Sequence, residues 1–255
     1  MMYLNEFEDS SVVEKTVYED VEKDLQERLY ILFSAASKQK FGIMLILEGW
    51  AGSGKGDVLK SITTRLDPRK VRVYSRENFL YQGGGYPFLF PFWSKLPAYG
   101  EFIIFSGSWY SRVSSDKVEK LITKDEYRTA FNSILNFEEM ITSDKYIIYK
   151  YFLNISEKEQ KKRLKKAKDE GNKWMVSDTD WFQLKHHDEF KKLYEEFLNR
   201  TSTPTAPWNI VPAKDKYFTR MYIMESLIAN LEEKLKMDSK EMLNVLKSTE
   251  KGQAV

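Results

Sequence analysis

Cysteine is absent from this chain of 255 residues, and its two histidines, His186 and His187, are adjacent. The missing thiols exclude disulfide bridges, thiolate zinc sites and cysteine nucleophiles. A single histidine pair is also a poor basis for a histidine-rich metal centre or for a Ser-His triad, because both draw their members from separate parts of a chain.

A large excess of one charge is absent too, because Lys and Arg number 40 and Asp and Glu number 38, which gives a net charge of +2. A net charge near zero argues against a protein that coats nucleic acid, so no nucleic-acid partner is expected. No apolar run approaches the roughly 18 residues of a membrane span, and the acidic start MMYLNEFEDS is unlike a secretory signal. Hydrophobic residues make up 42% of the chain, enough for a sizeable core. We therefore expect a globular, cytoplasmic protein without a membrane contact.

Five short apolar runs alternate with helical patterns, and charged residues or Gly, Pro or Asn bound each run. Continuous rather than alternating apolarity predicts strands that are buried on both faces, as in a parallel sheet. The runs are Phe41–Leu47, Val71–Tyr74, Phe102–Phe105, Tyr146–Leu153 and Trp208–Pro212. Strands that alternate with helices indicate an α/β domain.

The helical patterns have recognisable ends. Two segments carry apolar residues at helical spacing, Val12–Lys38 and Asp215–Met237. Thr123 with Glu126, and Ser156 with Glu159, are spaced as capping boxes that open two further helices. No repeat or Pro/Gly-rich linker divides the chain, so residues 1–237 are expected to form one domain. The polar tail, 238–255, is expected to fray.

The first apolar run leads directly into a glycine-rich segment, LEGWAGSGKG, at residues 47–56. Between a strand and a helix, such a loop lets successive backbone N–H groups point inward and cradle phosphate oxygens. The helix dipole and the charge of Lys55 add to the attraction. A glycine-rich turn without a ligand is disfavoured, because strand, loop, lysine and helix occur together. The predicted phosphate-binding residues are Gly49, Gly52, Ser53, Gly54, Lys55 and Gly56.

Six ordered segments, spread over roughly Val12 to Leu235, carry a resemblance to a known family. The most distinctive are SWYSR at 108–112 and TPTAPWNIV at 203–211. The others are EGWAGSGKG at 48–56, LDPRKVRVYS at 66–75, FWSKLPAYGEFIIF at 92–105, and FEEMI with YKYFLNISEKEQKKRL at 137–164. Together they resemble the polyphosphate kinase 2 family. The GSWY version of one segment is most similar to the N-terminal half of two-domain polyphosphate:AMP phosphotransferases.

The resemblance implies a P-loop kinase-like three-layer sandwich with a five-stranded, mainly parallel sheet and a helical lid at about 156–200. It implies a kinase that moves a phosphoryl group between inorganic polyphosphate and an adenine or guanine nucleoside mono- or diphosphate, with Mg²⁺. Lys55 and Arg112 are then the expected catalytic residues, since both can neutralise phosphate charge. For Arg112 the alternative is a surface ion pair. A homo-oligomer, or an assembly with a complete family member, is also expected.

Two departures from the family concern the metal. The family has Asp where this chain has Ala51 and Ser106, and the resemblance makes those carboxylates the magnesium-binding and catalytic acids. The remaining candidates for a metal ligand are Asp116 and Asp57, and Asp57 is equally explained as a charge that favours the helix dipole. The losses put Mg²⁺ binding in question. They keep a second function open, in which the chain binds polyphosphate or nucleotide as a regulatory or assembly subunit.

A run of positive charge lies at Lys158–Lys173, opposed only by Glu159, Asp169 and Glu170. On a helix it forms a positive stripe above Leu164 and Ala167. A solvated helix face is the simpler explanation, whereas a positive stripe beside a phosphate loop fits a long anionic ligand. The resemblance implies a lid over polyphosphate here, with contacts from Lys161, Lys162, Lys165 and Lys166.

Overall fold

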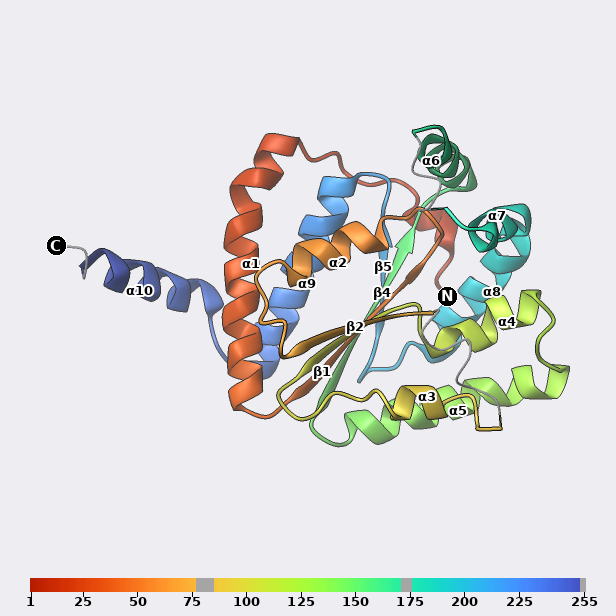
Figure 1. The fold of residues 1–255 in the computed structure, drawn as a ribbon, viewed down its shortest axis with the longest axis horizontal. Helices are drawn as coiled ribbons and strands as arrows, with labels where there is room; N and C mark the ends of the chain where they lie inside the picture. The colour runs from red at the N-terminus through yellow and green to blue at the C-terminus, as the bar shows by residue number, and fades with distance from the viewer. Residues whose placement is uncertain (77–84, 171–175, 253–255) are drawn as a thin grey trace.

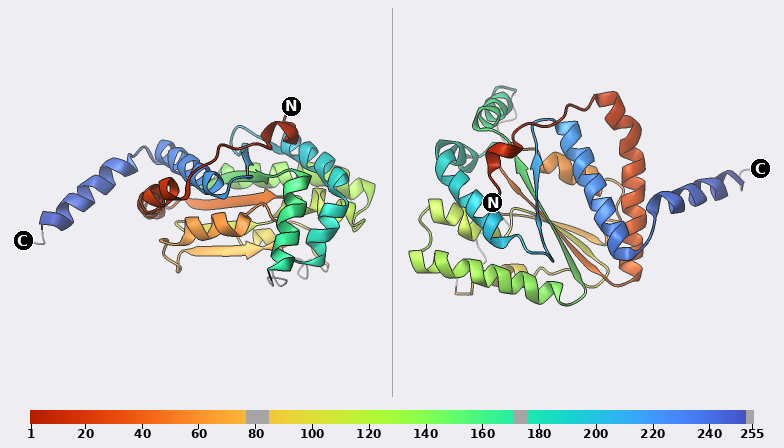
Figure 2. Two further views of the ribbon diagram at one scale, coloured as in Figure 1. Left: turned by 90° about the horizontal axis from the view of Figure 1, so that it is seen from above. Right: turned by 180° about the vertical axis from the view of Figure 1, so that it is seen from behind.

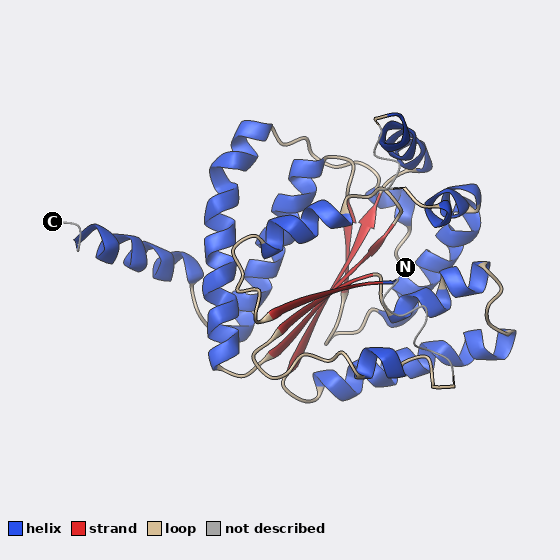
Figure 3. Cartoon of the chain, viewed as in Figure 1, coloured by secondary structure: helices blue, strands red, loops and turns tan. Residues whose placement is uncertain are grey.

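A five-stranded sheet forms the centre of the protein. The computed structural model describes residues 1–76, 85–170 and 176–252. The strand order is β2-β3-β1-β4-β5, and every pair of neighbours is parallel. Figure 3 shows the strands in red, surrounded by helices in blue. The predicted α/β fold with a parallel sheet is confirmed.

Each strand coincides with one of the predicted apolar runs. The strands are β1 (Gly42–Gly49), β2 (Val71–Ser75), β3 (Phe102–Ser106), β4 (Tyr146–Asn154) and β5 (Trp208–Pro212). In the central strand β1, the residues from Ile43 to Leu47 are all buried. At the edge of the sheet, β2 is partly exposed, with Val73 open to solvent. The expectation of burial on both faces is therefore wrong for β2, because an edge strand has a neighbour on one side only.

The helices form a layer on each face of the sheet. Figure 1 shows α1 (Lys15–Lys38), α2 (Lys55–Thr63) and α9 (Lys216–Leu235) on one face, and α3 (Phe90–Trp93), α5 (Lys124–Thr142) and α8 (His187–Thr201) on the other. The shorter elements are η1 (Leu4–Phe7), η3 (Trp109–Val113), α4 (Ser115–Val118), α6 (Glu157–Asp169) and α7 (Asp178–Lys185). This is the predicted three-layer arrangement.

One predicted capping box is complete and the other is half formed. At the start of α5, the Thr123 hydroxyl accepts from the Glu126 N–H, and the Glu126 carboxylate accepts from the Thr123 N–H. At the start of α6, the Ser156 hydroxyl accepts from the Glu159 N–H at 3.3 Å. The Glu159 carboxylate accepts instead from Arg163 at 2.9 Å. The guanidinium is a stronger, charged donor, so it takes the carboxylate from the cap.

The C-terminal segment expected to fray is a helix, α10 (Ser239–Gly252). The Glu232 carboxylate accepts hydrogen bonds from the Ser239 N–H and hydroxyl at the start of this helix. Leu243 is buried, and the rest of α10 projects from the body, as Figure 2 shows. Within the described parts of the chain, no helix is both long and apolar enough to span a membrane.

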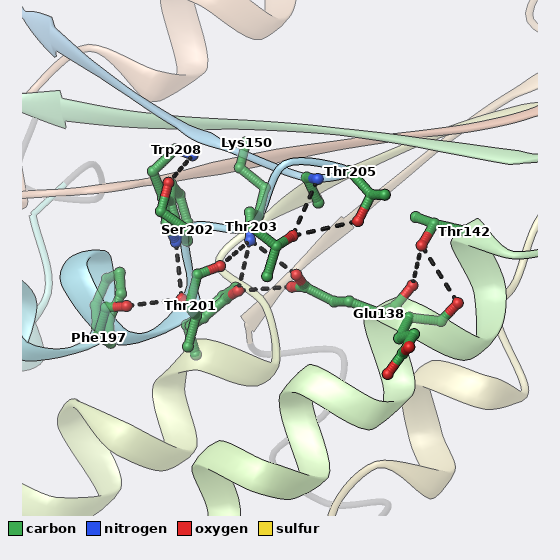
Figure 4. Close-up of polar contacts among 12 residues, drawn as sticks. Glu138, Thr142, Lys150, Phe197, Thr201, Ser202, Thr203, Thr205 and Trp208 are labelled. Atoms are coloured by element: carbon green, nitrogen blue, oxygen red, sulfur yellow. Dashed lines mark hydrogen bonds and ion pairs between the residues drawn. The ribbon is translucent and has the colours of Figure 1, made fainter.

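A buried ion pair links the sheet to the helices on one face (Figure 4). The Lys150 ammonium, on β4, donates to the Glu138 carboxylate at 2.7 Å, to the Thr201 carbonyl at 2.7 Å and to the Tyr110 hydroxyl at 3.1 Å. The other carboxylate oxygen of Glu138 accepts from Tyr110 and from Trp109. Burial lowers the pKa of Lys150, and the Glu138 charge opposes that shift. Every charged atom of the pair therefore has a partner.

Removing one member of this pair leaves the other charge buried and uncompensated. We expect Glu138→Gln to lower the free energy of unfolding by about 3–5 kcal/mol, measured by urea denaturation. Glu19→Gln breaks the exposed Lys15–Glu19 pair and is the matched control. It should leave the unfolding midpoint unchanged, because exposed pairs contribute little. Indistinguishable midpoints for the two variants would contradict a structural role for the buried pair.

Candidate active site

The connections after the neighbouring strands β1 and β3 run toward opposite edges of the sheet. The chain passes from β1 to β2, which lies beyond β3, and from β3 to β4, which lies on the other side of β1. Ligands of open parallel sheets bind outside the carboxyl ends of the strands at such a point. A cavity of about 230 Å³ lies there, and its walls include Glu48, Lys55, Arg76, Ser106 and Gln183. Lys55 thus meets residues from the carboxyl ends of three strands in this cavity: Glu48 of β1, Arg76 after β2 and Ser106 of β3.

The phosphate loop between β1 and α2 depends on two glycines. Gly49 has φ of +134°, and a Cβ there would lie 2.3 Å from the Leu153 carbonyl oxygen, so only glycine fits beside β4. Gly54 has φ of +98° and is the N-cap of α2. Both conformations lie in the region that favours glycine. The loop therefore ends at the first turn of α2, where helix geometry leaves N–H groups available to a ligand.

Lys55 folds back over this loop. Its ammonium donates to the carbonyl oxygens of Gly49 at 3.0 Å and Trp50 at 2.9 Å. Ser53 is 2% exposed, and its hydroxyl has no hydrogen-bond partner within the described ranges. The predicted phosphate-binding residues thus form one continuous loop with a lysine held across it.

Glu48 joins β1 to the segment that follows β3. One of its carboxylate oxygens accepts from the Ser108 N–H at 2.8 Å and from the Ser108 hydroxyl at 2.7 Å. Burial raises the pKa of Glu48, while the Ser108 hydrogen bonds and the positive charge of Lys55 oppose that shift. The carboxylate therefore holds the SWYSR segment at the mouth of the cavity.

Arg112, the second predicted catalytic residue, borders a different cavity of about 400 Å³. Its guanidinium pairs with Glu126 at 3.0 Å and with Asp116 at 3.8 Å, and it lies 5.3 Å from the centre of the Phe88 ring. The ion-pair alternative is therefore present. It does not remove the guanidinium from the cavity, so Arg112 can still meet an anion there.

Sequence reasoning missed Arg76, which borders both cavities. Its guanidinium pairs with Glu119 at 3.1 Å and with Asp116 at 3.6 Å. Its buried Nε has no hydrogen-bond partner in the described part of the chain. The available signal was its place directly after β2, at the carboxyl end of the sheet.

The two candidate metal ligands lie in separate cavities and each faces an arginine. Asp57 pairs with Arg220 at 3.2 Å beside a third cavity, of about 300 Å³. Asp116 lies among the arginines of the second cavity, and burial raises its pKa. Over residues 1–76, 85–170 and 176–252, no group of three His, Asp or Glu side chains could hold a metal ion. With Ala51 a methyl group, the donor set does not fit a resident Mg²⁺ site.

The lid lysines lie on α6, and all four are exposed: Lys161, Lys162, Lys165 and Lys166. Lys162 pairs with Glu159 at 3.3 Å, and Lys166 pairs with Glu170 at 3.6 Å. Leu164 is buried beneath them, as the stripe pattern predicts. Exposed pairs of this kind are weak, so the stripe keeps a positive surface.

A different member of the basic run ties α6 to the phosphate loop. The Arg163 guanidinium donates to the Gly52 carbonyl at 3.0 Å and to the carbonyls of Ala213 and Lys214. Of the segment predicted as a lid, 156–200, helix α8 belongs to the core, and residues 171–175 lie outside the described residues. Figure 1 shows α6 and α7 at the edge of the molecule, near the end of β4.

Two further contacts between the lid segment and the loop were also missed. The Gln183 side chain, on α7, accepts from the Ala51 N–H at 2.6 Å. The His187 ring stacks on the Trp50 indole, with centroids 4.1 Å apart and planes 10° apart. Burial lowers the pKa of His187. No motif marked Gln183, and nothing in the sequence gave His187 a role.

Comparison with known proteins agrees with this geometry. The family model described as Polyphosphate kinase 2 (PPK2) matches residues 12–239. The polyphosphate:AMP phosphotransferase of Pseudomonas aeruginosa is 28% identical over 227 residues, covering 89% of this chain and 46% of that protein. The GDP-polyphosphate phosphotransferase of Mycobacterium tuberculosis is 29% identical over 191 residues, covering 74% of this chain and 65% of that protein.

A solved structure is similar as well. The crystal structure titled as a polyphosphate kinase 2 from Pseudomonas aeruginosa superimposes with a TM-score of 0.84 at 26% identity, over 93% of this chain and 50% of that one. This chain spans 40% and 46% of the length of two polyphosphate:AMP phosphotransferases that it matches. The family match covers most of the sequence and the fold agrees, so this chain belongs to the polyphosphate kinase 2 family.

Proposed function

We propose that this chain transfers a phosphoryl group between inorganic polyphosphate and an adenine or guanine nucleoside mono- or diphosphate. The observation that carries the proposal is the placement of Lys55 across an open phosphate loop, with Arg76 bordering the same cavity. Similar proteins named for AMP and GDP support the two base classes. Both substrates occur in the cytoplasm, which is where we propose that the protein acts. Its assembly into a homo-oligomer stays a prediction.

The arrangement gives each substrate a place. Polyphosphate would lie along the phosphate loop and the positive face of α6, with Lys55 at the reacting phosphate. The acceptor would enter the cavity lined by Arg76, Arg112 and the aromatic rings of Tyr86 and Phe88. Phosphoryl transfer needs positioning and neutralisation of charge rather than covalent participation of the protein. The cations at the two cavities supply both. Mg²⁺ that arrives with a phosphate substrate needs no resident site.

A second candidate function is a binding or assembly subunit. Two observations favour it, namely the absence of a carboxylate at Ala51 and Ser106 and the pairing of Asp57 and Asp116 with arginines. Such a subunit would still bind phosphate through the loop. The two candidates therefore differ in turnover and agree in binding, and one experiment can separate them.

The direct test follows nucleotide formation from polyphosphate, with AMP, ADP, GMP and GDP as acceptors, in the presence of Mg²⁺. We expect turnover, and we expect Lys55→Met to lower kcat by about 100-fold or more, because it removes a charge that stabilises the transition state. Lys145→Met, directly before β4 at the amino end of the strands, is the control and should retain parental activity. A parent that binds tripolyphosphate without turning over any acceptor would favour the subunit.

The positive face of α6 should bind long phosphate chains. We expect replacement of Lys161, Lys162, Lys165 and Lys166 by Gln to weaken long-chain polyphosphate binding. The affinity should also depend less on salt, because salt screens the attraction between these exposed charges and the phosphates. The measurement is polyphosphate affinity at several salt concentrations. The control replaces four exposed lysines at the amino ends of the strands: Lys38, Lys40, Lys70 and Lys145. Equal behaviour of the two fourfold variants would mean that α6 presents only a solvated face.

Restoring the carboxylates that the family resemblance implies tests the metal argument. We expect Ala51→Asp with Ser106→Asp to raise Mg²⁺-dependent transfer at least tenfold, which needs only about 1.4 kcal/mol of transition-state stabilisation. The matched control carries Asn at both positions, which has a similar shape without the charge. Equal rates for the Asp and Asn pairs would contradict the metal argument.

A further inference from the structure

One peptide group of the phosphate loop, between Trp50 and Ala51, is held at both ends by side chains. Its N–H, on Ala51, donates to the Gln183 side-chain oxygen at 2.6 Å. Its carbonyl, on Trp50, accepts from the Lys55 ammonium at 2.9 Å and from the Ser53 N–H at 3.1 Å. The N–H and the carbonyl of a peptide group point in opposite directions, because the group is planar and trans. Fixing the N–H therefore fixes the direction of the Trp50 carbonyl, which holds Lys55 together with the Gly49 carbonyl.

Gln183 is itself fixed on the lid side. Its oxygen also accepts from the Gln160 side-chain nitrogen, on α6, at 2.9 Å, and its own nitrogen donates to the Tyr194 hydroxyl, on α8, at 2.6 Å. Gln160 is fully buried. Three helices thus set the position of one glutamine oxygen. That rigidity is what a positioning group requires, because an amide free to rotate could not select one orientation of the loop.

The Trp50 side chain is held independently of this hydrogen bond. His187 stacks on one face of the indole at 4.1 Å, and the Tyr194 ring packs edge-on at 4.8 Å. The indole N–H donates to the Asn154 side-chain oxygen at 2.8 Å. These contacts locate the Trp50 side chain and do not involve the following peptide group. The orientation of that group is set by the Gln183 hydrogen bond at its N–H, together with the Ser53 N–H at its carbonyl.

We propose that Gln183 is a positioning residue. It holds the Trp50–Ala51 peptide so that the Trp50 carbonyl places the Lys55 ammonium at the phosphate site. The proposal rests on the proposed function, since it assumes that Lys55 meets a phosphate. Gln183 also lines the cavity that contains Lys55, so a carboxylate introduced at this position would add a negative charge to that of Glu48.

The experiment measures tripolyphosphate affinity by calorimetry for the parent, Gln183→Leu, Gln183→Glu and the control Gln26→Leu. Gln26 is another buried glutamine, which donates to the Ser61 carbonyl on α2. We expect Gln183→Leu to bind about tenfold more weakly than the parent, as loss of one well-placed hydrogen bond predicts. The control should bind as the parent does. Unfolding temperatures of all variants separate a loss of affinity from a loss of stability.

Gln183→Glu supplies the rescue. It keeps an oxygen that can accept from Ala51, and it adds one negative charge. We expect it to bind weakly at low salt and to recover part of the parental affinity at 0.5 M salt, measured against the parent at the same salt, because screening weakens the repulsion of a partly buried charge without removing it. Gln183→Leu should stay weaker than the parent at both salt concentrations. General destabilisation would not produce this difference. The salt response of Gln183→Glu against the parent is measurable even if the leucine variant does not fold.

Three results would overturn the proposal. Parental affinity in Gln183→Leu would mean that the side chain only fills space. Tighter binding in that variant would mean that the glutamine oxygen competes with phosphate for the Ala51 N–H. A Gln183→Glu deficit that high salt leaves unchanged would show that the acceptor oxygen is not what matters. A parent that fails to bind tripolyphosphate would overturn the proposed function along with this inference, whereas the first three results leave the proposed function intact.

Discussion

The buried pair of Lys150 and Glu138 is the constraint on which the rest of the structure depends. An unpaired charge at that depth costs several kcal/mol, so the ammonium requires all of its partners at once. Those partners come from α5, from η3 and from the end of α8. The buried lysine of β4 therefore has all of its hydrogen-bond partners only when those three elements pack on the same face of the sheet. The SWYSR segment and the approach to β5 are thus fixed by electrostatics as well as by apolar packing.

This constraint extends to the candidate active site through a short stretch of chain. Tyr110 and Trp109 are anchored to Glu138, and Ser108, one residue earlier, donates two hydrogen bonds to Glu48. Arg112, two residues after Tyr110, is carried by the same segment to the cavity of about 400 Å³. The motif that marks the family most clearly is therefore largely structural. Its tyrosine and tryptophan hold a scaffold that aims the flanking serine and arginine.

The sequence predicts well what depends on local pattern. The continuous apolar runs give the five strands to within two residues, and the strand–glycine–lysine–helix order locates the phosphate loop. It predicts less well what depends on contacts between distant elements. The only signal for Arg76 was its position directly after β2. Gln183 lies in a helix without any motif, and the contact that singles it out is a hydrogen bond from Ala51, which is more than a hundred residues away in the sequence. Helix α10 was missed because its polar composition resembles a frayed tail, whereas Glu232 caps its first turn.

Under the proposed function, charge balance at the cavities would allow binding and turnover to separate. Three acids near the two cavities have a cationic neighbour: Asp116 and Glu119 face Arg76, and Glu126 faces Arg112. These pairs keep the arginines in place before any ligand arrives, which limits the entropy lost when an anion binds. A phosphate that enters must compete with the carboxylates, so part of its attraction is offset. At the loop, the carbonyls of Gly49 and Trp50 hold the Lys55 ammonium, and its charge also opposes the rise in the pKa of the buried Glu48 carboxylate. Under the proposed function, acceptor binding and transfer would therefore depend on how far a phosphate can displace the acidic partners of Arg76 and Arg112.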